Sequence, residues 1–124
     1  MKPSDHHVVV LGASAKSDRY SNQAVRLLLA KGYRVTPVHP KVSWIEGLRV
    51  AHALGEIREP VHTLTLYVGA SRIGPLVDAV IALRPGRVVL NPGAEAQELE
   101  RRLDAAGIPW MHACTLVMLR TGTF

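Results

Sequence analysis

The chain has 124 residues, of which 48% are hydrophobic and 20% charged, and this predicts a single globular domain over residues 1–124. These proportions exclude a disordered chain, and no segment approaches the roughly 18 consecutive apolar residues that a membrane helix requires. Fifteen basic against ten acidic residues give a formal net charge of +5, which favours an anionic ligand or partner.

The N-terminal part of the chain predicts a strand followed by a helix. Residues 8–11 are a continuous apolar run that ends at Gly12, as expected of a strand that is covered on both faces. Residues 24–29 then form a helical apolar stripe, for which Ser21 or Asn22 is the expected N-cap.

The middle of the chain predicts two further strands with an irregular segment between them. Residues 33–38 are the expected second strand. Residues 41–60 are less regular, and we expect a loop, a brief extended piece and one short helix there. Residues 63–68 predict a third strand, which ends at Gly69.

The C-terminal part continues the alternation of helix and strand. Residues 73–81 carry one apolar helical face, and residues 87–90 predict a fourth strand. A polar helix is expected to begin at about Ala94. Residues 108–113 predict a last strand, which Pro109 places at a sheet edge.

This alternation predicts an α/β fold, a Rossmann-like parallel sheet of about five strands with helices on both faces. Ligands of such sheets bind beyond the carboxyl ends of the strands. The rule selects segments rich in glycine, serine and asparagine, whose backbone amides can approach a phosphate. These segments are residues 12–14, 38–41, 68–72, 91–94 and 114–115.

The first strand-to-helix turn lacks the dinucleotide fingerprint G-x-G-x-x-G, because the next glycine after Gly12 is Gly32. The second strand also lacks the terminal carboxylate that binds an NAD ribose, and His39, Pro40 and Lys41 stand there instead. A lysine suits a phosphate on the ribose, which a carboxylate would repel. NAD is therefore disfavoured, while NADP and coenzyme A (CoA) stay open.

Several blocks of sequence resemble one family. They are V-V-L-G-A-S at 9–14, G-Y-R-V-T-P-V-H-P-K at 32–41, G-L-R-V at 47–50, N-P-G-A-E at 91–95 and A-C-T-L-V-M-L at 113–119. In this order they resemble the CoA-binding domain family, a Rossmann-like family that includes the nucleotide-binding domain of the succinyl-CoA synthetase α subunit and small stand-alone bacterial proteins. The second strand of that family usually ends in V-x-P-V-N-P-K, where this chain has His39 in place of the asparagine.

The resemblance implies that CoA or an acyl-CoA lies across the strand ends. The turn after the first strand would face the pyrophosphate, where a side chain on Gly12 would occupy the ligand's space. The turn after the second strand would hold the adenosine end, and the turns after the third and fourth strands would flank the rest of the ligand. The expected ligand-binding residues are Gly12, Ala13 and Ser14; His39, Pro40 and Lys41; Tyr67, Val68, Gly69 and Arg72; and Asn91, Pro92 and Gly93.

The sequence shows no catalytic constellation at these turns and no histidine spacing typical of a metal site. His6 and His7 precede the first strand, and we expect a solvated pair at the far end of the sheet. No Asp or Glu stands at a strand end to orient a histidine base such as His39 or His112. Cys114 is the single cysteine, which we expect to be packed rather than reactive.

These observations favour a non-catalytic CoA or acyl-CoA binding protein, such as a sensor or an accessory subunit. The alternative is a small NADP-linked oxidoreductase or other nucleotide-binding enzyme that uses the same strand-end site. The scattered basic residues and the aromatic content of only 5% argue against nucleic-acid and membrane partners, while a homodimer or a protein partner stays open. A single cysteine excludes an intrachain disulfide and favours the cytoplasm.

Overall fold

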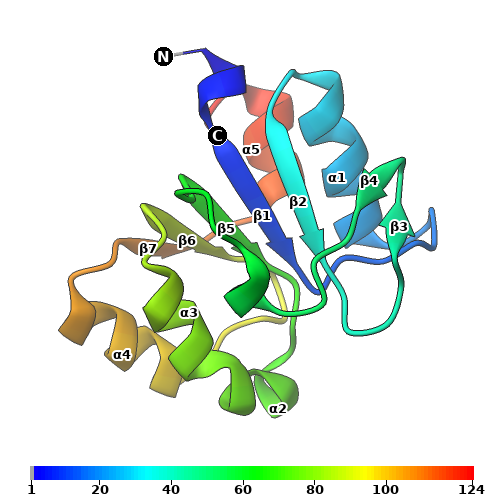
Figure 1. The fold of residues 1–124 in the computed structure, drawn as a ribbon. Coiled ribbons are helices and arrows are strands. Elements are labelled where there is room, and N and C mark those ends of the chain that lie inside the picture. Colours follow the sequence, from blue (N-terminus) through cyan, green and yellow to red (C-terminus); the bar gives the residue numbers. More distant parts are fainter. Residues whose placement is uncertain (1) are drawn as a thin grey trace.

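A computed structural model describes residues 2–124 and contains a central sheet of five parallel strands, in the order β2-β1-β5-β6-β7 (Figure 1). The strands are β1 (His7–Leu11), β2 (Arg34–Val38), β5 (Thr63–Leu66), β6 (Arg87–Leu90) and β7 (Trp110–His112). The predicted α/β class and parallel sheet are confirmed, and β7 is an edge strand, as Pro109 predicts.

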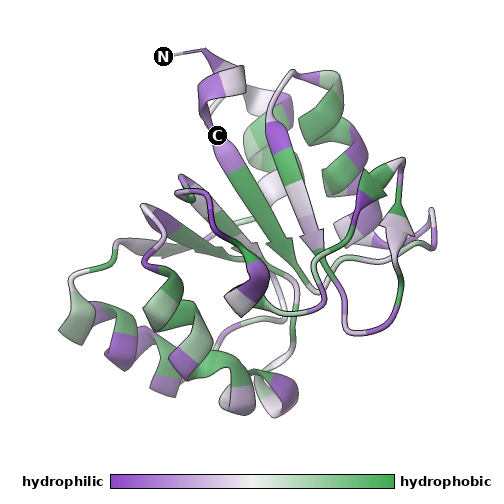
Figure 2. Cartoon of the chain, viewed as in Figure 1, coloured by the Kyte–Doolittle hydropathy of each residue, from purple (hydrophilic) through white to green (hydrophobic). Residues whose placement is uncertain are grey.

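Helices cover the sheet on both faces (Figure 1). They are α1 (Tyr20–Ala30), α2 (Ala70–Ile73), α3 (Val77–Leu83), α4 (Gln97–Ala106) and α5 (Thr115–Thr121). α1 packs beside α5 on one face, and α3 packs beside α4 on the other. Alternate residues of β1 enter two separate cores, because Val8 and Val10 pack with the α1 side while Val9 and Leu11 pack with the α3–α4 side. This explains the unbroken apolar run along β1 (Figure 2).

The irregular segment before β5 contains a small antiparallel hairpin of β3 (Trp44–Ile45) and β4 (Leu48–Arg49). Glu46 and Gly47 form its turn with φ of 50° and 77°, the left-handed conformation that tight hairpins use. Short 3-10 turns complete the fold at Pro3–Asp5, Leu54–Glu56 and Gly74–Leu76. Among residues 2–124, no helix has both the length and the apolar character needed to cross a membrane.

Some element boundaries differ from the predicted ones. The predicted N-cap of α1 is wrong, because the helix begins at Tyr20 with Arg19 as its N-cap and places Ser21 and Asn22 inside the first turn. The predicted helix over residues 73–81 is divided into α2, a 3-10 turn and α3. Sequence reasoning did not predict α5, which follows the last strand.

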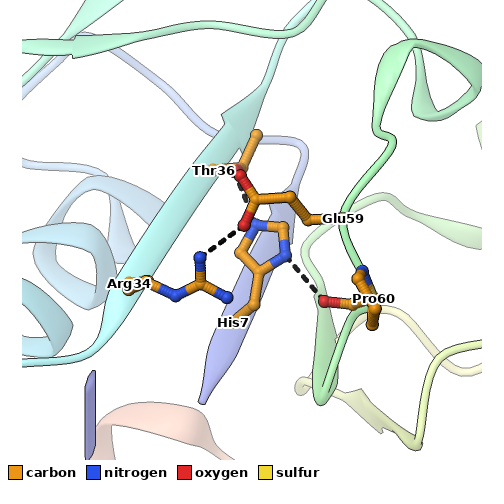
Figure 3. Close-up of polar contacts among 5 residues, drawn as sticks. All are labelled: His7, Arg34, Thr36, Glu59 and Pro60. Carbon is orange, nitrogen blue, oxygen red and sulfur yellow. Dashed lines mark hydrogen bonds and ion pairs between the residues drawn. The ribbon is translucent and has the colours of Figure 1, made fainter. Parts of the chain in front are cut away.

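A buried histidine joins three segments at the amino end of the sheet (Figure 3). His7 is only 4% exposed, so the expected solvated pair is wrong for this residue. Its Nδ1 donates to the carbonyl of Pro60 (3.0 Å), and its Nε2 then accepts from the hydroxyl of Thr36 (2.7 Å). An ion pair between Arg34 and Glu59 lies beside it. This histidine is therefore structural and lies at the opposite end of the sheet from the predicted site.

Candidate functional site at the strand ends

A cavity of about 710 Å³ opens at the carboxyl ends of β1, β2 and β5. The chain leaves β1 toward β2 and later returns to the other side of β1 as β5, so the strand order reverses at this point. Crevices at such reversals are the usual ligand sites of open parallel sheets. The lining comprises Leu11, Gly12, Ala13, Ser14, Lys16, Arg19, Tyr20, Ser21, Val38, His39, Pro40, His52, Ala53, Leu54, Tyr67, Val68, Arg72, Leu76 and Pro92.

The structure brings most of the predicted binding residues into this one lining. They are Gly12, Ala13, Ser14, His39, Pro40, Tyr67, Val68, Arg72 and Pro92. Four other predicted residues, Lys41, Gly69, Asn91 and Gly93, lie in the same turns but do not line the cavity. The Lys41 side chain is exposed, and the Asn91 side chain points into the protein.

The structure gives a reason of its own for glycine at position 12. Its φ is +87°, and an added Cβ would lie 2.9 Å from the carbonyl oxygen of Tyr67 and 3.0 Å from Cγ2 of Val68. A side chain there would therefore collide with the chain after β5. Glycine lets the first turn pass against the end of β5, which positions both walls of the cavity.

A buried asparagine that sequence reasoning misassigned holds the loop between β1 and α1. Asn22 is 0% exposed, and its Nδ2 donates to the Ser14 carbonyl (2.9 Å) and to Glu46 Oε2 (3.1 Å). Its Oδ1 accepts from Arg26 Nε (2.8 Å), and the same guanidinium donates to the Ser17 carbonyl (2.7 Å). The loop is thus tied to both α1 and the hairpin. Its neighbours Ser21 and Gln23 are also polar, so the local sequence carried no signal that this amide is buried.

Three cationic side chains line the cavity, and no Asp or Glu does so among the residues described. Lys16 and Arg19 come from the loop after β1, and Arg72 comes from α2. Sequence reasoning selected only Arg72. Lys16 and Arg19 lie in the loop between the first strand and the first helix, and this position was a signal for the other two. An unbalanced positive charge of this kind favours an anionic ligand.

The loop after β2 is organised around His39. Its backbone N–H donates to the Ala51 carbonyl (3.0 Å), and its Nδ1 accepts from the backbone N–H groups of Lys41 and Val42 (both 3.0 Å). These bonds set the path of the loop, while the Lys41 side chain faces solvent.

Asn91 closes the turn after β6 from inside. It is 1% exposed, and its Nδ2 donates to Thr65 Oγ1 (2.8 Å) and to the Leu66 carbonyl (2.9 Å). Its Oδ1 accepts from the backbone N–H of Thr115 (2.8 Å). Both the nitrogen and the oxygen of this amide therefore bond to the protein and join β5, β6 and α5. The side chain supports the site without facing it.

Two reactive side chain types occur near the strand ends. Burial raises the pKa of the Tyr67 hydroxyl to about 12, an effect that the nearby Thr115 and Thr65 hydroxyls only partly offset, so the phenol is neutral at pH 7. Cys114 is a half-buried free thiol at the N-cap of α5 and is not part of the cavity lining.

The structure also contains a histidine–carboxylate pair that the sequence did not reveal. His112 Nε2 lies 3.0 Å from Glu100 Oε2, so a carboxylate does orient one strand-end histidine, contrary to expectation. The pair lies at β7 and α4, outside the cavity lining. Within the described residues, no three His, Cys, Asp or Glu side chains gather as a metal site.

Comparison with known proteins supports the resemblance seen in the sequence blocks. A family model described as "CoA binding domain" matches residues 6–120. A crystal structure of an uncharacterized protein shares 34% identity over 96% of this chain and 98% of that one, with a TM-score of 0.84. A protein from Thermus thermophilus shares 30% identity over the full length of both chains, with a TM-score of 0.88.

A larger enzyme contains the same fold as one of its parts. This chain aligns with a dinucleotide-forming acetyl-coenzyme A synthetase from Ca. Korarchaeum cryptofilum, solved with phosphate and ADP, at 22% identity and a TM-score of 0.75. The alignment covers 89% of this chain but only 25% of the synthetase, and at this identity it shows the fold alone.

Proposed function

The chain belongs to the CoA binding domain family, and we propose that it binds CoA or an acyl-CoA in the cavity at the ends of β1, β2 and β5. The observation that carries this proposal is the chemistry of the lining. Three cationic side chains stand at one site without a carboxylate, beside apolar side chains that include Leu54, Val68 and Leu76. CoA combines phosphates with a largely uncharged arm, so both parts of the lining have a counterpart in the ligand.

We assign the phosphates to the loop after β1 and to α2. Lys16, Arg19 and Arg72 supply charge-assisted hydrogen bonds, and the turn at Ser14 supplies backbone groups next to them. The uncharged arm then lies along Val68 and its apolar neighbours. The NADP-linked alternative uses the same cations, and the binding experiment below separates the two ligands.

We also propose that the chain carries out no chemistry on the bound ligand and acts as a sensor or an accessory subunit in the cytoplasm. No carboxylate lines the cavity within the described residues to orient His39 or His52, and the His112–Glu100 pair lies elsewhere. A free thiol at Cys114 fits a reducing compartment.

Calorimetric titration of the purified protein with CoA and with NADPH tests the binding. We expect CoA to bind, and Arg19→Gln and Arg72→Gln each to weaken it by roughly 10- to 150-fold, the equivalent of the 1.5–3 kcal/mol of a charged hydrogen bond. Arg58→Gln is the matched control, because Arg58 is exposed and does not line the cavity. A folded wild-type protein that releases no heat with CoA contradicts the proposal.

Incubation with acyl-CoA and NADPH tests the absence of chemistry. We expect neither free thiol nor a loss of NADPH absorbance over time. Turnover that disappears in Cys114→Ser would show that the protein is an enzyme.

A further inference from the structure

We infer that His39 uses its two ring nitrogens for different purposes at this site: Nδ1 shapes the loop after β2, and Nε2–H donates a hydrogen bond to a phosphate oxygen of the bound nucleotide. The inference rests on the proposed CoA site and adds a donor that the cationic side chains do not provide.

The tautomer of His39 follows from its two backbone contacts. The N–H groups of Lys41 and Val42 both lie 3.0 Å from Nδ1. Both groups are donors only, so Nδ1 must be the acceptor and cannot carry a proton. The proton of the neutral imidazole is therefore on Nε2.

The Nε2–H group is left without a partner in the protein. His39 lines the cavity, and no hydrogen bond to Nε2 occurs within residues 2–124. The other charged and titratable side chains of the cavity lining are Lys16, Arg19, Tyr20, His52, Tyr67 and Arg72. None of these is a carboxylate that could compete for Nε2–H, and the half-exposed ring leaves this donor open to a ligand in the cavity. An anionic phosphate oxygen suits this donor in a lining with three cations.

Replacement of His39 by asparagine separates the two roles. The Oδ1 of an asparagine is as many bonds from Cα as the Nδ1 of a histidine, so asparagine can accept the same two backbone N–H groups. It has no group at the position of Nε2. The substitution His39→Asn should therefore keep the loop and remove the ligand contact, while His39→Ala removes both.

The experiment compares wild type, His39→Asn and His39→Ala by thermal unfolding without ligand and by calorimetric titration with CoA. We expect His39→Asn to keep the melting temperature of the wild type and to bind CoA roughly tenfold more weakly or worse, as for loss of a hydrogen bond to a charged group. We expect His39→Ala to lose both stability and affinity. Titration with 3′-dephospho-CoA then identifies the phosphate. If His39→Asn weakens CoA only, the contact is to the ribose phosphate, and if it weakens both ligands, the contact is to the pyrophosphate.

Two results would overturn this inference and leave the proposed function standing. They are equal CoA affinity of wild type and His39→Asn, or a melting temperature of His39→Asn that falls as far as that of His39→Ala. Long-range ¹H–¹⁵N spectra of the imidazole give a check that needs no ligand, and a proton found on Nδ1 would also refute it. If the wild-type protein does not bind CoA at all, the proposed function fails, and this inference fails with it.

Discussion

The substitution Gly12→Ala tests how the cavity walls are positioned. The left-handed φ of +87° costs an alanine about 1–2 kcal/mol, and its Cβ would lie 2.9 Å from the backbone oxygen of Tyr67, an overpacking that typically costs about 1–3 kcal/mol. We therefore expect a loss of about 2–5 kcal/mol in the free energy of unfolding. Gly107→Ala is the matched control, because Gly107 has φ +72° and nothing within 4 Å of its added Cβ.

Urea denaturation of wild type, Gly12→Ala and Gly107→Ala measures the contribution of the close contact. We expect the control to lose only the cost of its backbone conformation, about 1–2 kcal/mol. Gly12→Ala should also weaken CoA binding, because the displaced Tyr67 and Val68 line the cavity. Equal losses of stability in the two variants would refute the reasoning, since they would mean that the approach of Gly12 to the Tyr67 carbonyl imposes no constraint.

Three other perturbations have expected outcomes. Burial, His6 and Arg87 lower the pKa of His62 below 6.5, so His62 is harder to protonate in the folded protein than in the unfolded chain. The stability of the fold is therefore fully present above pH 6.5 and is partly lost on acidification. The melting temperature of wild type relative to that of His62→Gln should fall between pH 7.5 and 5, and a constant difference would contradict the prediction. Lys41→Gln should leave the preference for CoA over 3′-dephospho-CoA unchanged in calorimetry, because the Lys41 side chain is exposed and does not line the cavity, and a reduced preference would show that Lys41 contacts the ribose phosphate. Asn22→Ala should lower both the unfolding free energy and the CoA affinity, whereas full affinity would show that the loop keeps its position without this amide.

The sequence predicts best those elements whose hydrophobic pattern is complete within one segment of the chain. The apolar run of β1 and the helical stripe of α1 each carry their own period, and the alternation of such segments is enough to predict the parallel sheet. The two-residue strands of the hairpin are too short to show a period. α5 has seven residues, and no side chain caps its first turn, so it lacked a start signal.

The candidate site was predictable as a set of turns but not as a set of side chains. The rule that ligands bind at strand ends places the right segments together, because it depends on the order of elements alone. Whether a side chain in a turn faces the cavity depends on contacts across the sheet. Asn91 lies in a turn at a strand end, where the rule places ligand-binding residues. Its amide nevertheless bonds to Thr65 and Thr115, which are distant in sequence. Nothing local in the sequence distinguishes that orientation from a ligand contact.

The two buried asparagines suggest why this site suits binding. Asn22 fixes the loop after β1, and Asn91 fixes the turn after β6, and both amides are satisfied by the protein itself. A ligand therefore does not have to order these segments when it binds, which removes part of the entropy cost of association. Within the described residues, the cationic side chains of the lining and the Nε2–H of His39 make no hydrogen bond to the protein, so an anionic ligand can be their partner. Folding thus completes the supports of the site and leaves its cationic side chains available for a ligand.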